Sequence, residues 1–121
     1  MPTTVIVVVA VFFLAMGLYG LATPAALIRP FGVVLSSADA RTEVRAVYGG
    51  FGIAMAGLLA VAALDVGQVR QGAVLAVACA LAGMAVGRLV GWVADRQIGF
   101  YPTWFYFGVE AVAAGALLGA L

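Results

Sequence analysis

The sequence predicts an all-α integral membrane protein, an antiparallel bundle of four membrane-spanning helices forming a single domain. Hydrophobic residues make up 66% of the 121 residues and charged residues only 9%, with a mean hydropathy of +1.20. A soluble domain carries about 25% charged residues, and one this short could not bury so much apolar surface. Four long apolar runs account for most of the chain, and turns containing proline or charged residues separate them.

The first predicted helix covers residues 3–22, an apolar run of about 30 Å that is long enough to cross the hydrocarbon core. It lacks the positively charged start of a signal peptide, so we expect it to be retained. Pro24 ends this helix, because proline cannot donate a backbone hydrogen bond or fit a helix interior. The mostly apolar residues 25–35 should form a short interfacial segment between the first two helices.

The second predicted helix covers residues 37–64, and Ser36 followed by Asp39 resembles a capping box at its start. A short polar turn leads to the third helix, residues 71–94. The next turn contains a proline suited to the first position of a helix, and the fourth helix covers residues 103–121. Because the connections are short, we expect consecutive helices to be antiparallel neighbours.

The loop arginines predict the orientation of the bundle. Arg29 and Arg41 lie in the first loop and Arg96 lies in the third, whereas the opposite side carries Arg70. Loops rich in Lys and Arg stay in the cytoplasm. We therefore expect loops one and three inside the cell and both termini outside.

Charge and residue content exclude several functions. The net charge is +1 without a basic patch, so no nucleic acid partner is expected. The chain has no His and one Cys, Cys79, so the usual zinc or haem ligand sets are missing and we expect no metal and no cofactor. A nucleophile–base pair and a nucleotide-binding loop are also missing, so no catalytic residue is assigned.

Two ionisable residues fall inside predicted spans. Arg88 lies about two turns before the end of the third helix, and Glu110 lies about two turns after the start of the fourth. A charge inside a membrane costs roughly 3 kcal/mol or more and usually faces the protein interior. Since the two depths match on antiparallel neighbours, we predict a buried ion pair between Arg88 and Glu110, which would either fix helix register or serve a ligand.

Further polar and aromatic residues share that half of the bilayer, whereas the other half is built from Ala, Val, Leu and Gly. Some of the Trp and Tyr side chains there are also typical of interfacial anchors. The candidate ligand-binding residues are Arg45, Tyr48, Arg88, Trp92, Asp95 and Glu110.

The order of these residues resembles that in a known family. Arg45-Ala46-Val47-Tyr48-Gly49-Gly50 opens the second helix, Gly87-Arg88 follows in the third, and Asp95 and Glu110 come after it. Over nearly the whole chain this pattern resembles a bacterial family of small four-helix membrane proteins, catalogued as domain of unknown function 4345. The resemblance implies the fold, a bacterial cytoplasmic membrane and the polar signature, but no activity. A looser architectural similarity links the chain to DoxX-like membrane proteins.

We expect the charged and aromatic cluster to bind a lipid or small amphiphile, or the chain to act as an accessory subunit of a larger membrane complex. Arg45 and Arg88 would attract an anionic headgroup, and Glu110 would orient Arg88. One alternative is proton or solute transport by a homo-oligomer, in which a buried carboxylate changes its protonation. An enzyme acting on a membrane substrate is a second alternative, less favoured because the chain lacks catalytic groups.

Overall fold

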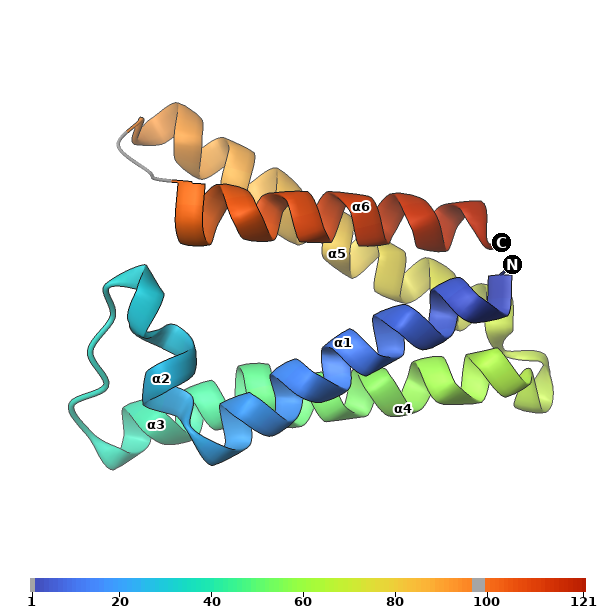
Figure 1. Cartoon of the computed structure of the whole chain (residues 1–121), viewed down its shortest axis with the longest axis horizontal. Helices are drawn as coiled ribbons and strands as arrows, with labels where there is room; N and C mark the ends of the chain where they lie inside the picture. The colour runs from blue at the N-terminus through green and yellow to red at the C-terminus, as the bar shows by residue number, and fades with distance from the viewer. Residues whose placement is uncertain (1, 97–99) are drawn as a thin grey trace.

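A computed structural model describes residues 2–96 and 100–121 of the chain, and these residues are helical apart from short connections (Figure 1). The all-α prediction is therefore confirmed for the described part of the chain. Helix α1 spans Pro2–Ala22. Helix α2 spans Pro24–Ile28 and continues into a 3-10 turn at Arg29–Phe31, so the expected interfacial segment is partly helical.

The second predicted helix forms a continuous helical path with three parts. Helix α3 spans Ala38–Val44, a π-helical turn spans Arg45–Gly50, and helix α4 spans Phe51–Leu64. The side-chain oxygen of Ser37 accepts a hydrogen bond from the backbone N–H of Ala40 at 3.0 Å. The cap is therefore one residue later than the expected capping box.

Helix α5 spans Arg70–Ala94. Helix α6 spans Phe105–Gly119 and follows the short segment Phe100–Trp104, which is kinked at Tyr101 (φ -108°, ψ 128°). Residues 97–99 lie outside the described part. Among the described residues, three helical paths are long and apolar enough to cross a membrane, namely Pro2–Ala22, Ala38–Leu64 and Arg70–Ala94. The 15-residue α6 is shorter than a typical span, so a bundle of four spanning helices stays a prediction.

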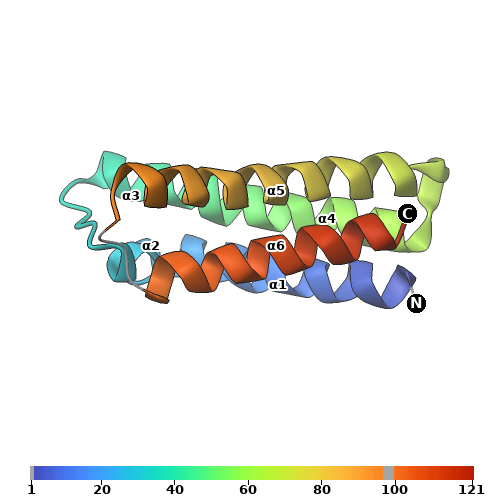
Figure 2. The same cartoon turned by 90° about the horizontal axis from the view of Figure 1, so that it is seen from above.

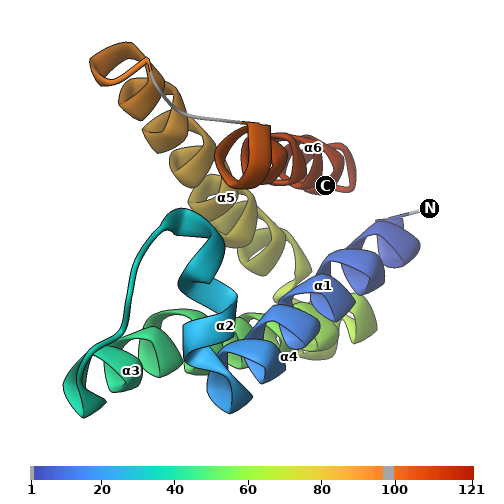
Figure 3. The ribbon, with the colours of Figure 1, turned by 60° about the vertical axis from the view of Figure 1, so that its left-hand side comes forward.

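The long helices form two pairs. Helix α1 packs along α4 and helix α5 along α6, and these two pairings have the most extensive contacts (Figures 1 and 2). Both chain ends lie at the same end of the molecule. The two pairs converge there and separate toward the opposite end, where α2 and α3 lie (Figure 3).

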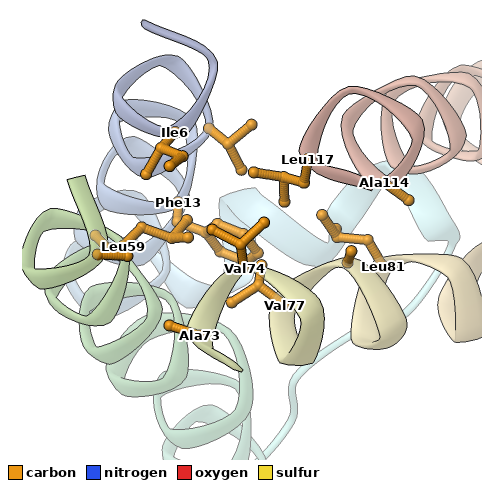
Figure 4. Packing of buried hydrophobic residues seen from close by; sticks show 13 residues of the cluster. Ile6, Phe13, Leu59, Ala73, Val74, Val77, Leu81, Ala114 and Leu117 are labelled. Atoms are coloured by element: carbon orange, nitrogen blue, oxygen red, sulfur yellow. The ribbon is translucent and has the colours of Figure 1, made fainter. Parts of the chain in front are cut away.

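The apolar core lies where the pairs converge. Side chains of all four long helices meet there (Figure 4), and the largest fully buried ones are Ile6, Val74, Val77, Leu59 and Leu117. These residues lie near the start of α1 and α5 and near the end of α4 and α6. The core therefore closes one end of the molecule and leaves the other end to the polar and aromatic residues.

Helix α1 contacts the π-helical turn and α4 through their backbones. A Cβ atom added to Gly17 would lie 2.7 Å from the backbone nitrogen of Ile53, and one added to Gly52 would lie 2.9 Å from the Cα of Gly17. Such distances are too short for any residue other than glycine. Small residues of this kind let membrane helices pack closely.

Candidate functional site

Arg88 and Glu110 form the buried ion pair that the sequence predicts. The Arg88 Nε donates to Glu110 Oε1 at 2.8 Å, and Nη2 donates to Oε2 at 3.0 Å. This bidentate arrangement places two parallel N–H···O bonds between planar groups, which is the strongest geometry for such a pair. Among the described residues, Glu110 is the only charged residue that is buried, with 6% of its surface exposed.

Aromatic rings surround the guanidinium group. Its central carbon lies 5.6 Å from the centre of the Tyr106 ring and 5.9 Å from that of Phe31, within the range of cation–π attraction. The two rings also stack on each other, with centres 5.8 Å apart. The 3-10 turn after α2 thus folds inward onto α6. Sequence reasoning missed Phe31, because an apolar segment between two spans is equally suited to lie along the membrane surface.

A large groove opens beside the ion pair. Its volume is about 1320 Å³, and its walls come from α1, the π-helical turn at Arg45–Gly50, α5 and α6. Most of the lining is aliphatic or aromatic, and Arg88 and Glu110 are its charged residues. Tyr48 and Tyr106 add phenol groups to these walls. A long apolar space with few polar groups is typical of a site for a hydrophobic ligand.

A second, smaller cavity adjoins the groove. It has a volume of about 410 Å³ and lies between α1, the α2 segment and the start of α6. Tyr19 and Tyr101 line it, and Tyr106 lines both spaces. All four tyrosines of the chain therefore face one of the two cavities. The polar side chains of the groove and cavity are mainly hydroxyl groups rather than charges.

The comparison with protein families agrees with the resemblance seen in the sequence. Residues 2–121 match the family model described as domain of unknown function DUF4345. The chain belongs to this family. Neither the search of curated proteins nor the search of solved structures gave a match. Membership in DUF4345 supplies no activity, so function has to be argued from the site.

The π-helical turn of this DUF4345 protein coincides with its Arg-Ala-Val-Tyr-Gly-Gly motif. Arg45 Nε donates to the backbone carbonyl of Leu21 at 3.0 Å, so this arginine caps the end of α1 instead of entering the groove. Tyr48 lines the groove, and Gly49 packs against Leu21. The motif thus joins three tasks on one turn: a helix cap, a groove wall and a close helix contact. Turns of this rare type are often found at functional sites.

Trp92 and Asp95 lie at the end of α5 and do not line the groove, although Trp92 contacts Trp104, which does. The Trp92 ring contacts Trp104 edge-on with centres 5.8 Å apart, and the Arg96 guanidinium lies 4.2 Å from the centre of the Trp92 ring. Asp95 follows the last residue of α5 and is exposed. Of the six candidate residues, Tyr48, Arg88 and Glu110 are brought together around the groove, whereas Arg45, Trp92 and Asp95 are not.

Within residues 2–96 and 100–121, no three side chains of His, Cys, Asp or Glu come together in a way that could hold a metal ion. Cys79 is exposed on α5. The site offers a ligand one ion pair, several hydroxyl groups and a large apolar surface.

Proposed function

We propose that this DUF4345 protein is an integral membrane protein that binds a lipid or another small amphiphile in the groove beside Arg88 and Glu110. The observation that carries the proposal is the groove itself, about 1320 Å³ in volume and almost wholly apolar, with one ion pair in its wall. Its volume exceeds the roughly 300–1,000 Å³ of most small-molecule pockets. A hydrocarbon tail suits the apolar walls, and a polar head suits the position of Arg88.

The outer surface supports placement in a membrane. Large apolar side chains stand exposed on every long helix, for example Val11 at 59%, Val61 at 40%, Val90 at 62% and Leu118 at 47%. Soluble proteins rarely expose continuous apolar surface of this kind. A surface made of aliphatic groups is instead what contact with lipid chains requires.

The same proposal makes α6 the fourth span. Tyr101 has extended backbone angles, so only residues 102–104 of the preceding turn add to the 15 residues of α6, which still brings the segment close to the length that crosses a bilayer. Arginine placement favours both termini on the outer side of a bacterial cytoplasmic membrane. A reporter fused to the C-terminus should then be active outside the cell, and a cytoplasmic signal would reverse this orientation.

Two glycines of α6 provide a matched test of ligand binding. Gly108 lines the groove and Gly115 does not, and a Cβ added at either position meets no atom within 4 Å. Gly108→Phe should fill the groove and lower the amount of lipid that copurifies in native mass spectrometry. Gly115→Phe is the control and should retain the lipid of the wild type. Equal lipid retention by both variants would refute binding in this groove.

A further inference from the structure

The charges that line the groove indicate which class of amphiphile it binds. The inference drawn from them rests on the proposed function. Arg88 is the cation and Glu110 the anion among the residues that line the groove. Their two hydrogen bonds of 2.8 and 3.0 Å neutralise one charge with the other. The other arginine expected to attract an anionic head, Arg45, donates instead to the Leu21 carbonyl. The groove therefore offers no excess positive charge.

One donor of Arg88 is still available to a ligand. The ion pair uses Nε and Nη2, and Nη1 makes no hydrogen bond within the described chain. Every buried side-chain nitrogen or oxygen of the described residues has a hydrogen-bond partner. Because Nη1 has no such partner, it is not fully buried. Since Arg88 lines the groove, this nitrogen can donate to an acceptor atom there.

An anionic head would meet opposing effects at this place. It must leave water, which is costly for a charge, and its attraction to Arg88 is reduced by repulsion from Glu110, which lies on the opposite edge of the guanidinium. An uncharged head with a carbonyl or hydroxyl oxygen loses less on leaving water. It can still accept a hydrogen bond from Nη1, and the nearby tyrosine hydroxyl groups provide further polar partners.

We infer that the groove selects an uncharged amphiphile, with a hydrogen-bond-accepting ester, carbonyl or hydroxyl head on a long hydrocarbon tail, over an anionic one. The ion pair carries no net charge and donates a hydrogen bond to the ligand through Nη1. Glu110 thus does more than orient Arg88, because its negative charge excludes anionic competitors. Discrimination by an unfavourable interaction with the wrong ligand is a general route to specificity.

Dioleoylglycerol and dioleoyl phosphatidic acid are suitable probes, since they share their tails and glycerol backbone and differ by one phosphate. The purified full-length protein is offered equal amounts of both in detergent micelles, and bound lipid is measured by native mass spectrometry. The wild type should retain dioleoylglycerol in roughly tenfold excess. Glu110→Gln leaves the charge of Arg88 unopposed and should shift the preference toward phosphatidic acid. Arg88→Gln combined with Glu110→Gln restores neutrality and should restore the preference for dioleoylglycerol.

The possible outcomes separate this inference from the proposed function. Preference of the wild type for phosphatidic acid would overturn the selectivity while leaving lipid binding in place. An unchanged preference in folded Glu110→Gln would also overturn it. If the wild type retains neither lipid above the level of Gly108→Phe, both the selectivity and the proposed function fail. The wild-type comparison decides the inference even if Glu110→Gln does not fold.

Discussion

The two helix pairs of this molecule are held together by different means. Helix α1 meets α4 and the π-helical turn before it backbone to backbone, through glycines at positions 17, 49 and 52. Helices α5 and α6 are joined by apolar side chains of the core and, in addition, by the Arg88–Glu110 ion pair. The glycines of α5 at positions 83, 87 and 91 have no atom within 4 Å of an added Cβ, so they face outward from this pair.

This difference shows how the groove is built. A backbone contact needs only small residues and leaves little space beside it. The α5–α6 contact also includes long polar side chains, namely the ion pair of Arg88 and Glu110. The groove borders that polar contact, and its charged residues are the same two that hold α5 against α6. The same two charged residues therefore contribute to stability and to the groove wall in the α5–α6 pair, whereas the glycines of the α1–α4 contact do not line the groove.

The largest expected effect comes from breaking the ion pair on one side. Arg88→Ala leaves Glu110 as a buried carboxylate without its cation and should lower the free energy of unfolding by about 3 kcal/mol. Replacing both partners, as Arg88→Met with Glu110→Leu, should cost much less because no charge is left unpaired. Thermal unfolding in detergent micelles measures both.

The double variant also separates the two roles of the pair. If it is as stable as the wild type but retains less lipid, the pair serves binding more than folding. A double variant as unstable as Arg88→Ala would contradict this account of the α5–α6 contact.

A smaller loss is expected from crowding the α1–α4 contact. A Cβ atom at Gly52 would lie 2.9 Å from Gly17 Cα and 3.0 Å from the Phe13 carbonyl oxygen, so the helices must move apart. Gly52→Ala should cost about 2 kcal/mol. Gly87→Ala is the matched control on the outer face of α5 and should change stability by less than about 0.5 kcal/mol.

The Gly87→Ala variant also tests whether two copies of the chain associate through α5. A second copy of the chain that packs against the outward-facing glycines of α5 would be displaced by a larger side chain there, and size-exclusion chromatography would show the change. An equal loss of stability in Gly52→Ala and Gly87→Ala would remove the distinction between the two pairs.

Sequence reasoning predicted much of this architecture for physical reasons. Apolar runs and polar turns placed the long helices within a few residues, because a bilayer restricts helix length so strongly. The depths of Arg88 and Glu110, together with a short loop, were enough to predict their ion pair. Tyr48 also lines the groove, as its place in the motif suggested.

Other features depend on contacts that periodicity does not report. Regular α-helical spacing puts Arg45 and Tyr48 on one face, but the π-helical turn changes this spacing, and Arg45 reaches the end of α1 instead. The inward fold of Phe31 depends on the matching surface of Tyr106, which no local pattern reveals. The outward direction of the α5 glycines likewise follows from how the pairs pack.

The smallest effects should come from two arginines that cap helix ends. Arg70 donates to the carbonyls of Ala62 and Ala63 at 2.9 and 2.7 Å, which ties the start of α5 to the end of α4, and Arg45 donates one bond of 3.0 Å to the end of α1. A cation at a helix C-terminus stabilises the helix dipole and satisfies free carbonyls. Arg70→Ala should therefore cost about 1 kcal/mol, and Arg45→Ala, with a single exposed bond, roughly half of that.

The larger loss expected for Arg70→Ala than for Arg45→Ala tests how the helix pairs are held together. Arg45 reinforces α1–α4, which glycine contacts already hold, whereas Arg70 links α5 to α4 across the two pairs. Thermal unfolding of the two variants, with Arg41→Ala at a half-buried position of α3 as a control, measures the difference. If Arg45→Ala proves the more damaging variant, the α1–α4 pair depends on its polar cap, and backbone packing alone does not hold it.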